Sequence, residues 1–482
     1  MKKVLSLLLV FALLIPFAAC AKKEEPSAAT AREEATTVAE TDAPAVTTTL
    51  SPEEEEEAWQ KENARLYAAR FNGIADPDVR AAVEDFYGEC YNPTKLLRWW
   101  AGLYDPERGA FYYAISARDG AGYLPDMEST YQIVDKLLQF DRDGDLARYL
   151  GSEITEKMIA FYQTMQDESD GYFYHPQWTK EQSRKNVMRY TRDQDWAIFV
   201  LDKLHSAPLY PTALERLNGD GASVSTDWGP NEESVKAYVR NLIATNTCEN
   251  WANELSTQAT TFEAAGVLGY IIDVLDETIN PEYGLWASDY DGEYNYKNLR
   301  TEPMTENAYG IMTCTYKLMV LYNLAGRAVP YPVKMAESAA HVIELYDIST
   351  RVTYVYNPWA TLGTLRINLD GFGTPEQVAG YDAVIGEHMI GMLSALKTAL
   401  AKYRQSDGGY GFLKTGSASS VYGTKVSQGK EEGDVNATNM VYLLSEHVSR
   451  VLGLSSPIPI FNVSHGRQLR QLLDNAPKIV KK

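Results

Sequence analysis

The sequence of 482 residues is poor in the side chains that build most metal and redox sites. It contains four cysteines and six histidines, and it has no CxxC pair. A zinc ribbon and a dithiol redox pair are therefore excluded. Besides Cys20, the cysteines are Cys90, Cys248 and Cys314. This odd number allows at most one disulfide outside the cytoplasm, and we expect buried free thiols instead.

Motifs for nucleotides and for common hydrolytic mechanisms are also missing. The chain has no GxxxxGK[ST] phosphate loop, no GxGxxG, no HExxH and no GxSxG. No cofactor and no metal ion are predicted. Acidic residues outnumber basic ones by 65 to 45, which gives a formal net charge of −20. An acidic chain without a basic stripe is not expected to bind nucleic acid or anionic lipid headgroups.

A long apolar run lies at the N-terminus. Lys2 and Lys3 precede apolar residues 4–19, which form a run too short and wrongly flanked for a stable membrane span. Phe17-Ala-Ala-Cys20 resembles a bacterial lipobox, so we expect residues 1–19 to be a lipoprotein signal peptide and Cys20 to be acylated. Ordinary secretory cleavage at Ala19-Cys-Ala21 is the alternative. A lipid on Cys20 would hold the protein on the extracytoplasmic side of the cell membrane, in contact with the membrane through this anchor alone.

Residues 20–58 have the composition of a disordered linker. The segment is rich in Ala, Thr, Glu and Pro, and residues 21–57 carry eleven acidic and three basic side chains. Such a segment buries too little apolar surface to offset its ordering entropy. The run from Glu53 to Glu57 is expected to extend the chain by charge repulsion. The folded domain is therefore expected at residues 59–482.

The rest of the chain repeats a loop that combines glycine with aromatic residues. The clearest copies are 104–113, 170–174, 281–286 and 407–412, and weaker copies lie at 226–229 and 356–359. Their marker residues lie 50 to 75 residues apart: Gly109, Gly171, Gly229, Gly284, Trp359 and Gly409. This period suits a repeated unit of one loop and two helices, and six such hairpins can close into a ring.

Apolar residues recur with the 3.6-residue period of a helix, and convincing strands are almost absent. Stretches that are apolar around most of their circumference are expected to be inner helices: 127–140, 192–205, 252–276, 304–325, 376–401 and 434–452. Outer partners are expected at 76–91, 146–166, 231–246, 332–347 and 466–476. Asp126, Asp193, Thr305 and Asp434 stand at expected N-caps. The predicted fold is all-α, a double ring of helical hairpins.

This pattern resembles the (α/α)6 toroids over residues 90–475. That group includes the six-hairpin glycosidases, related polysaccharide lyases and sugar epimerases, and the terpenoid cyclases and prenyltransferases. Residues 98–112 are similar to the first repeat of N-acylglucosamine epimerases, and Asp407-Gly-Gly-Tyr-Gly-Phe412 is similar to the repeats of prenyltransferases and terpene cyclases. The paired histidines of the epimerases and the aspartate-rich motif of the cyclases have no match. The resemblance implies the fold and a site at the mouth of the ring, but no particular reaction.

The expected helix starts share acidic or amide side chains, and a toroid would gather them at one end. Each residue taken singly is explained as an ordinary N-cap, whereas six such starts together point to a ligand site. Glycoside hydrolysis needs one protonated and one ionised carboxyl group. We predict this pair among Asp126, Glu128, Asp193 and Asp195, and one arrangement has Glu128 as the acid and Asp195 as the base.

Aromatic and polar residues near the loops and helix starts are expected to bind substrate. Sugar C–H faces lie on aromatic rings, while sugar hydroxyl groups meet polar side chains. The predicted substrate-binding residues are Tyr123, Tyr174, His175, Trp178, Trp196, Trp286, Glu306, Asp382, Asp434 and Asn436. The same rings would also serve as core at the end of the barrel. The predicted ligand is a carbohydrate or another small polar molecule.

We predict a surface-tethered glycoside hydrolase, and three alternatives stay open. A lipoprotein of the same fold would bind glycan or peptide without catalysis. A lyase or epimerase is less favoured, and a lyase would use Tyr174 or His175 as its base. A terpenoid cyclase or prenyl-transfer relative is the third alternative, but the sequence lacks a recognisable set of metal ligands for it.

The segment Asp141-Arg-Asp-Gly-Asp145 has the alternating carboxylates of a calcium loop. Leu146 and Ser152 stand where an EF-hand has Gly and Glu, so a polar turn is favoured.

Overall fold

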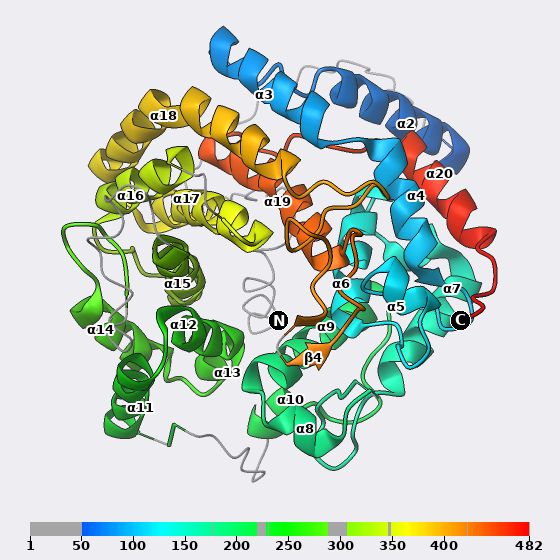
Figure 1. Cartoon of the computed structure of the whole chain (residues 1–482), viewed down its shortest axis with the longest axis horizontal. Coiled ribbons are helices and arrows are strands. Elements are labelled where there is room, and N and C mark those ends of the chain that lie inside the picture. Colours follow the sequence, from blue (N-terminus) through cyan, green and yellow to red (C-terminus); the bar gives the residue numbers. More distant parts are fainter. Residues whose placement is uncertain are drawn as a thin grey trace, which may run out of the picture.

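The computed structural model describes residues 51–175, 177–218, 228–229, 231–287, 306–345, 349–421 and 423–481. These residues are mostly helical, so the predicted all-α class is confirmed (Figure 1). The strands of the described residues form two short antiparallel pairs, β1 (Tyr104–Asp105) with β2 (Ala110–Phe111), and β3 (Ser420–Val421) with β4 (Thr424–Lys425). No helix in the described ranges is both long enough and apolar enough to cross a membrane.

Six helices lie around the centre of the molecule (Figure 1). They are α6 (Met127–Leu137), α9 (Val187–Lys203), α12 (Cys248–Thr257), α15 (Glu306–Ala325), α17 (Val352–Phe372) and α19 (Val435–Val451). Each of these helices contacts the next one along the chain, and α19 contacts α6. The contacts among the six inner helices therefore form a closed cycle.

The other helices pack outside the inner six or connect them. The longer ones are α2 (Pro52–Ala68), α3 (Pro77–Cys90), α4 (Pro93–Leu103), α7 (Leu146–Gln163), α11 (Glu232–Thr245), α14 (Leu268–Thr278), α16 (Pro332–Glu344), α18 (Pro375–Ala401) and α20 (Val463–Asp474). The shorter ones are α5 (Ile115–Asp119), the 3-10 helix Leu138–Phe140, α8 (Lys180–Arg184), α10 (Ala213–Asn218) and α13 (Ala259–Ala264). In the outer layer, α3 contacts α18 and α18 contacts α16.

Burial separates the inner helices from the outer ones. Every residue of α6 is buried, and so is the unbroken stretch 354–365 of α17. In the outer helix α11, by contrast, the buried residues are Val235, Val239 and Leu242, which lie on one face. An inner helix has neighbours on several sides, so residues around most of its circumference are buried, including the charged residues Glu128, Asp135 and Lys136 of α6.

The Gly-aromatic loops are closed by antiparallel pairing in four places, and three of them share one backbone arrangement. Antiparallel pairing joins Tyr104 to Phe111, Gln166 to Phe173, Asn280 to Leu285 and Arg404 to Tyr410. In the first three loops, the amides of Gly109, Gly171 and Gly284 each donate at 2.8 Å to the carbonyl four residues earlier. Gly284 has φ +66°, and a Cβ there would lie 2.6 Å from the Met335 nitrogen, so the turn requires glycine. The repeat seen in the sequence is thus a repeated structural unit.

Threonine side chains join three of these loops to inner helices. Phe111 N donates a hydrogen bond to Thr130 Oγ1 of α6 at 3.0 Å, and Tyr410 N donates to Thr438 Oγ1 of α19 at 2.9 Å. Trp286 N donates to Thr315 Oγ1 of α15 at 3.5 Å. These bonds link each loop to an inner helix, near the N-terminus of α6 and α19 and in the middle of α15.

The loop predicted at Tyr356-Asn-Pro-Trp359 is wrong, because these residues lie within α17. Pro358 lacks an amide hydrogen and disfavours a helix interior. The segment is helical nevertheless, and we attribute this to the burial of its neighbours, among them the fully buried Trp359. The inner helix of this repeat is therefore α17, and the prediction of an inner helix at 376–401 is wrong: α18 lies outside, against α16 and α17.

Other boundaries also differ from the sequence prediction. The stretch 252–276 falls within three helices, α12, α13 and α14, with Gly266 at φ +71° between the last two. Helix α9 begins at Val187, so Asp193 lies inside it and is not an N-cap. Helix α2 includes Glu53 to Glu57, for which a disordered linker was expected, and Ser51 and Glu54 form its capping box. Thr305 lies outside the described residues.

Candidate functional site

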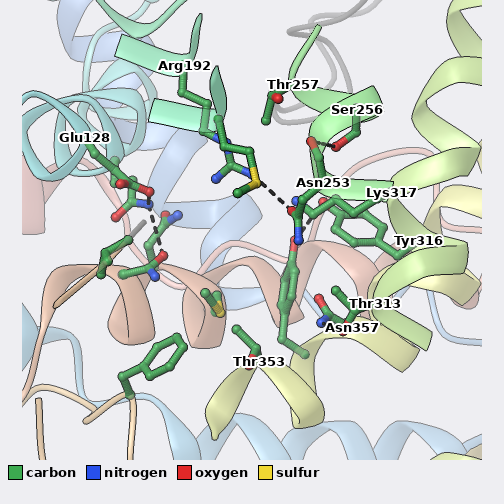
Figure 2. Close-up of a pocket in the computed structure, with 18 of the residues that line it drawn as sticks. Glu128, Arg192, Asn253, Ser256, Thr257, Thr313, Tyr316, Lys317, Thr353 and Asn357 are labelled. Carbon is green, nitrogen blue, oxygen red and sulfur yellow. Dashed lines mark hydrogen bonds between the residues drawn. The ribbon is translucent and has the colours of Figure 1, made fainter. Parts of the chain in front are cut away.

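A cavity of about 570 Å³ lies among the six inner helices. Each helix contributes a polar or charged residue to its wall: Glu128, Asp195, Asn253, Lys317, Asn357 and Asn436. These residues lie in the first two turns of α6, α12 and α19, in the second turn of α17, in the middle of α9 and in the fourth turn of α15. Figure 2 shows Glu128 on one side, Lys317, Tyr316 and Thr313 on the other, and Arg192 and Asn253 between them. The size and the mixed lining are typical of a small-molecule site.

Two predicted site residues cap helices beside the cavity. Asp126 is the N-cap of α6 and accepts a hydrogen bond from Ser129 N at 2.9 Å. Asp434 is the N-cap of α19 and accepts from Ala437 N and Phe412 N, each at 2.8 Å. Burial raises the pKa of Asp434 to about 7, although these amides lower it. Both carboxylates are turned toward backbone amides and neither lines the cavity.

Arg189 holds three of the four predicted catalytic carboxylates. The Arg189 cluster consists of Arg189, Asp126, Glu128 and Asp193, with N–O distances from Arg189 of 2.7 Å, 3.3 Å and 3.0 Å respectively. All four side chains are buried. Burial acts to raise the pKa of Asp126, but the Arg189 charge and the Ser129 amide lower it below its usual value. Burial raises the pKa of Asp193 to about 7 against the same Arg189 charge.

The structure separates the four carboxylates into two kinds. Asp126 and Asp193 do not line the cavity, whereas Asp195 and Glu128, which also contacts Arg189, do. Burial raises the pKa of Glu128 to about 7, and Arg189 opposes this rise. Burial also raises the pKa of Asp195 to about 7, opposed by Arg192. Each of these two cavity carboxyl groups can therefore gain or lose a proton near neutral pH.

Trp196 and Asn436 are predicted substrate-binding residues that line the cavity. The Trp196 ring stacks on Tyr131, with centroids 5.8 Å apart and an interplanar angle of 22°. Asn436 accepts a hydrogen bond from Gln132, which also donates to Glu128. The cavity therefore offers a flat aromatic wall next to polar groups.

Four other predicted binding residues pack in the loops away from the cavity. Tyr123 donates to Ser427 O at 2.8 Å, and Tyr174 donates to Asp170 at 2.8 Å. His175 Nε2 contacts Pro125 O at 2.8 Å and lies against the ring of Trp178. Trp178 also faces the Arg189 guanidinium, 5.2 Å from its ring. These contacts give the four side chains structural partners.

The other predicted binding residues and the cysteines do not form part of the cavity wall as described. Trp286 is fully buried, and its Nε1 donates to Leu275 O at 2.9 Å, so it belongs to the core. Asp382 lies inside α18, with 53% of its side chain exposed and an ion pair to Arg366 at 2.7 Å. Glu306 begins α15, but its side chain lies outside the described part of the chain, as does Cys20. Cys90, Cys248 and Cys314 are buried free thiols, as predicted.

Several cavity residues were missed by the sequence analysis. Lys317 and Tyr316 lie deep within an apolar helix, and Tyr356 and Asn357 lie in a segment that was taken for a loop. Tyr356 and Tyr316 hydroxyls are 3.5 Å apart, and Tyr356 OH lies 3.0 Å from His447 Nε2. A signal was present in the sequence, because Lys317 is a lone charge in the apolar stretch 311–325.

The segment Asp141-Arg-Asp-Gly-Asp145 forms a turn closed by its own hydrogen bonds. Asp141 Oδ1 accepts from the amides of Asp143 and Asp145, and Arg148 pairs with the carboxylates of Asp141 and Asp143. The Arg148 guanidinium thus lies beside the carboxylate oxygens that a calcium ion would need as ligands. Within the described ranges, no group of three or more His, Cys, Asp or Glu side chains is arranged to hold a metal ion.

Comparison with known proteins gives no match: no protein-family model, no curated protein and no solved structure is similar to this chain.

Proposed function

We propose that this protein is a carbohydrate-active enzyme of the (α/α)6 toroid type, and that it hydrolyses glycosidic bonds with Glu128 and Asp195. The observation that carries the proposal is that these two carboxyl groups, from neighbouring helices, share one cavity. The closed cycle of contacts among six inner helices supports the toroid assignment.

The chemistry of the cavity fits glycoside hydrolysis. One carboxyl group must protonate the leaving oxygen while the other stays ionised to activate water or attack the sugar. The pKa of each group is raised to about 7, so near neutral pH the singly protonated pair is well populated. The stacked Trp196 and Tyr131 provide a surface for a sugar ring, and amide side chains such as Asn253 suit its hydroxyl groups.

A panel of polysaccharides mixed with the purified domain tests this proposal through binding and released reducing ends. The variants E128Q and D195N should each lower the rate on a hydrolysed glycan by about 10²- to 10⁴-fold, because each removes an acid or base. D382N is the matched control, since Asp382 lies on α18, is exposed and does not line the cavity. A glycan that binds and yields no product would refute hydrolysis of that glycan, and equal rates in all three variants would refute the carboxyl pair.

The roles within the pair can be separated with an activated substrate. A glycoside with a good leaving group, such as dinitrophenolate, needs little protonation. The variant that lacks the acid should keep most of its rate on this substrate, whereas the variant that lacks the base or nucleophile should stay slow. We assign the acid to Glu128 and the base to Asp195, and the opposite pattern of rates would reverse this assignment.

A non-catalytic glycan- or peptide-binding protein is the second candidate. It is favoured by the contact of Glu128 with Arg189 at 3.3 Å, which ties this carboxylate to a structural cluster. A lyase is the third. Its base would be Tyr316 or Tyr356, which line the cavity, and not Tyr174 or His175, which do not. A lyase product absorbs ultraviolet light through its new double bond, so the same panel distinguishes it from hydrolysis.

We further propose that Cys20 is acylated and that the protein is anchored on the extracytoplasmic side of the cell membrane through this lipid. The support is the lipobox-like Phe17-Ala-Ala-Cys20 after an apolar segment. In cells, the wild-type protein should sediment with membranes and the C20S variant should not. Equal distributions of the two proteins would contradict the anchor.

A further inference from the structure

The side of the cavity opposite Glu128 carries positive charge. Lys317 of α15 faces the cavity there, next to Tyr316 and Thr313 (Figure 2). Arg192 of α9 lies between the two sides and donates to Asn253 Oδ1 at 3.2 Å. Arg351, which precedes α17, lines the rim and is exposed.

Lys317 is the unusual member of this group. No carboxylate among the described residues lies within ion-pair distance of its Nζ, which sits 4.9 Å from the centre of the Tyr316 ring. Burial, and then the charge of Arg192, lower the pKa of Lys317 to about 7, while Glu128 and Glu249 act in the opposite direction. Lys136 in the same cavity differs, because it pairs with Asp135 at 2.6 Å and with Glu446 at 3.8 Å. Lys317 is half-buried, so its ammonium group is partly removed from water without a counter-ion among the described residues, and we expect a ligand to supply the anion.

We propose that Lys317, assisted by Arg192 and Arg351, binds an anionic substituent on a sugar of the ligand, so that the substrate is an acidic glycan. This inference rests on the proposed carbohydrate function. Glu128 lies across the cavity from Lys317 (Figure 2), so a saccharide whose anion contacts Lys317 would extend toward the carboxyl pair.

The negative net charge of the protein limits where an acidic glycan could bind. With a net charge of −20, the protein repels polyanions at long range. Acidic glycans would therefore bind through a local cluster of cations and not through the general surface. Arg351 at the rim has no acidic partner among the described residues, and its guanidinium lies 5.5 Å from the Tyr354 ring centre. It would be the first cation that an entering anion meets.

The test compares glycans that share a backbone and differ in whether they carry an anionic group. Polygalacturonate is matched with its fully methyl-esterified form, and dextran sulfate with dextran, so the two pairs distinguish a carboxylate from a sulfate. Binding to the full-length protein is measured by calorimetry together with reducing-end release. We expect the charged member of at least one pair to bind, and its neutral partner to bind at least about 30-fold more weakly, as expected for losing one partner of a desolvated charge pair.

Variants assign the effect to Lys317. K317M should weaken binding of the acidic glycan by about 30-fold or more, and K317R should restore part of it. K334M is the matched control, because Lys334 on α16 is exposed, pairs with Glu337 at 2.8 Å and does not line the cavity. K317M removes a half-buried charge that has no ion-pair partner among the described residues, so the variant is expected to fold.

The pH dependence adds a second readout. The lysine must be protonated to pair with an anion, so affinity should fall as pH rises through about 7 in the wild type. The other groups that face Lys317 are Arg192, Glu128, Glu249 and, from α17, Tyr356. Glu128 ionises over the same range, and its negative charge acts in the same direction. In K317M the dependence should be weaker.

Two failures are distinguishable. If neutral glycans bind and are hydrolysed equally by wild type and K317M, the anionic subsite is wrong while hydrolysis stands. If acidic glycans bind in a Lys317-dependent way and no product forms, the subsite stands and the hydrolase proposal fails. Binding of neither acidic glycan, or equal binding of charged and neutral partners, would overturn the inference.

Discussion

Arg189 and Lys317 are both cations held by inner helices, and they differ in their partners. Arg189 contacts three carboxylates, on α6 and α9, at 2.7 to 3.3 Å. Lys317 contacts none among the described residues and faces a cavity. The first arrangement is complete within the protein and needs no ligand. The second leaves a charge to be satisfied, which indicates where a ligand would bind.

Removal of the Arg189 charge should have the largest effect on folding. R189M leaves buried carboxyl groups without their common counter-ion, and we expect a loss of about 3–5 kcal/mol in the free energy of unfolding. K317M, which removes a cation without such partners, should change it little or raise it. Urea unfolding of the two variants measures the contrast, and similar losses in both would mean that Arg189 and Lys317 play the same structural role.

Asp195 should destabilise the protein as pH rises. Its pKa is raised to about 7 in the folded state, against about 3.9 for an unperturbed Asp. Between these values the folded form holds a proton that the unfolded form has lost, so stability from this group falls as pH rises from about 4 to about 7. D195N removes this pH-dependent contribution of Asp195 to the free energy of unfolding. It should therefore gain stability over wild type across that window, reaching about 2 kcal/mol above pH 7, since water in the cavity offsets part of the shift. A difference between the two proteins that stays constant with pH would contradict the raised pKa.

Trp196 and Trp178 provide the same comparison for aromatic side chains, one facing the cavity and one packed against protein partners. Trp196 lines the cavity, whereas Trp178 packs on His175 and faces Arg189. W196A should weaken the best glycan of the panel by about 1 kcal/mol, because a sugar loses its stacking surface. W178A should leave this affinity unchanged and lower the melting temperature. If W178A lost affinity and W196A did not, the loop residues would form the binding site.

Asp382 provides the smallest expected effect. Its ion pair joins α18 to Arg366 of α17, and 53% of the Asp382 side chain is exposed. Exposed pairs contribute little, so D382N should change the free energy of unfolding by less than about 1 kcal/mol and leave glycan binding unaltered. A clear loss of binding in D382N would show that the outer layer takes part in the site.

The sequence alone was sufficient for most helices, because their signals are local. Helical periodicity located α3, α7, α11, α15 and α19 within a few residues, and Asp126 and Asp434 marked two helix starts correctly. Periodicity failed at α17, where Pro358 and the aromatic residues imitate a loop. It also failed at 252–276, since it carries no information about a break such as that at Gly266.

The repeated loops and the helices that follow them were determined by the sequence, because a glycine at positive φ and a polar N-cap act over a few residues. The division of four candidate carboxylates was decided by the tertiary structure. Residues two positions apart on a helix point about 200° apart, so in α9 Asp195 faces the cavity while Asp193 does not. The partner that holds Asp126 is Arg189, 63 residues away. An ion pair between such distant residues forms when two helices pack side by side, and the same packing leaves Lys317 facing open space.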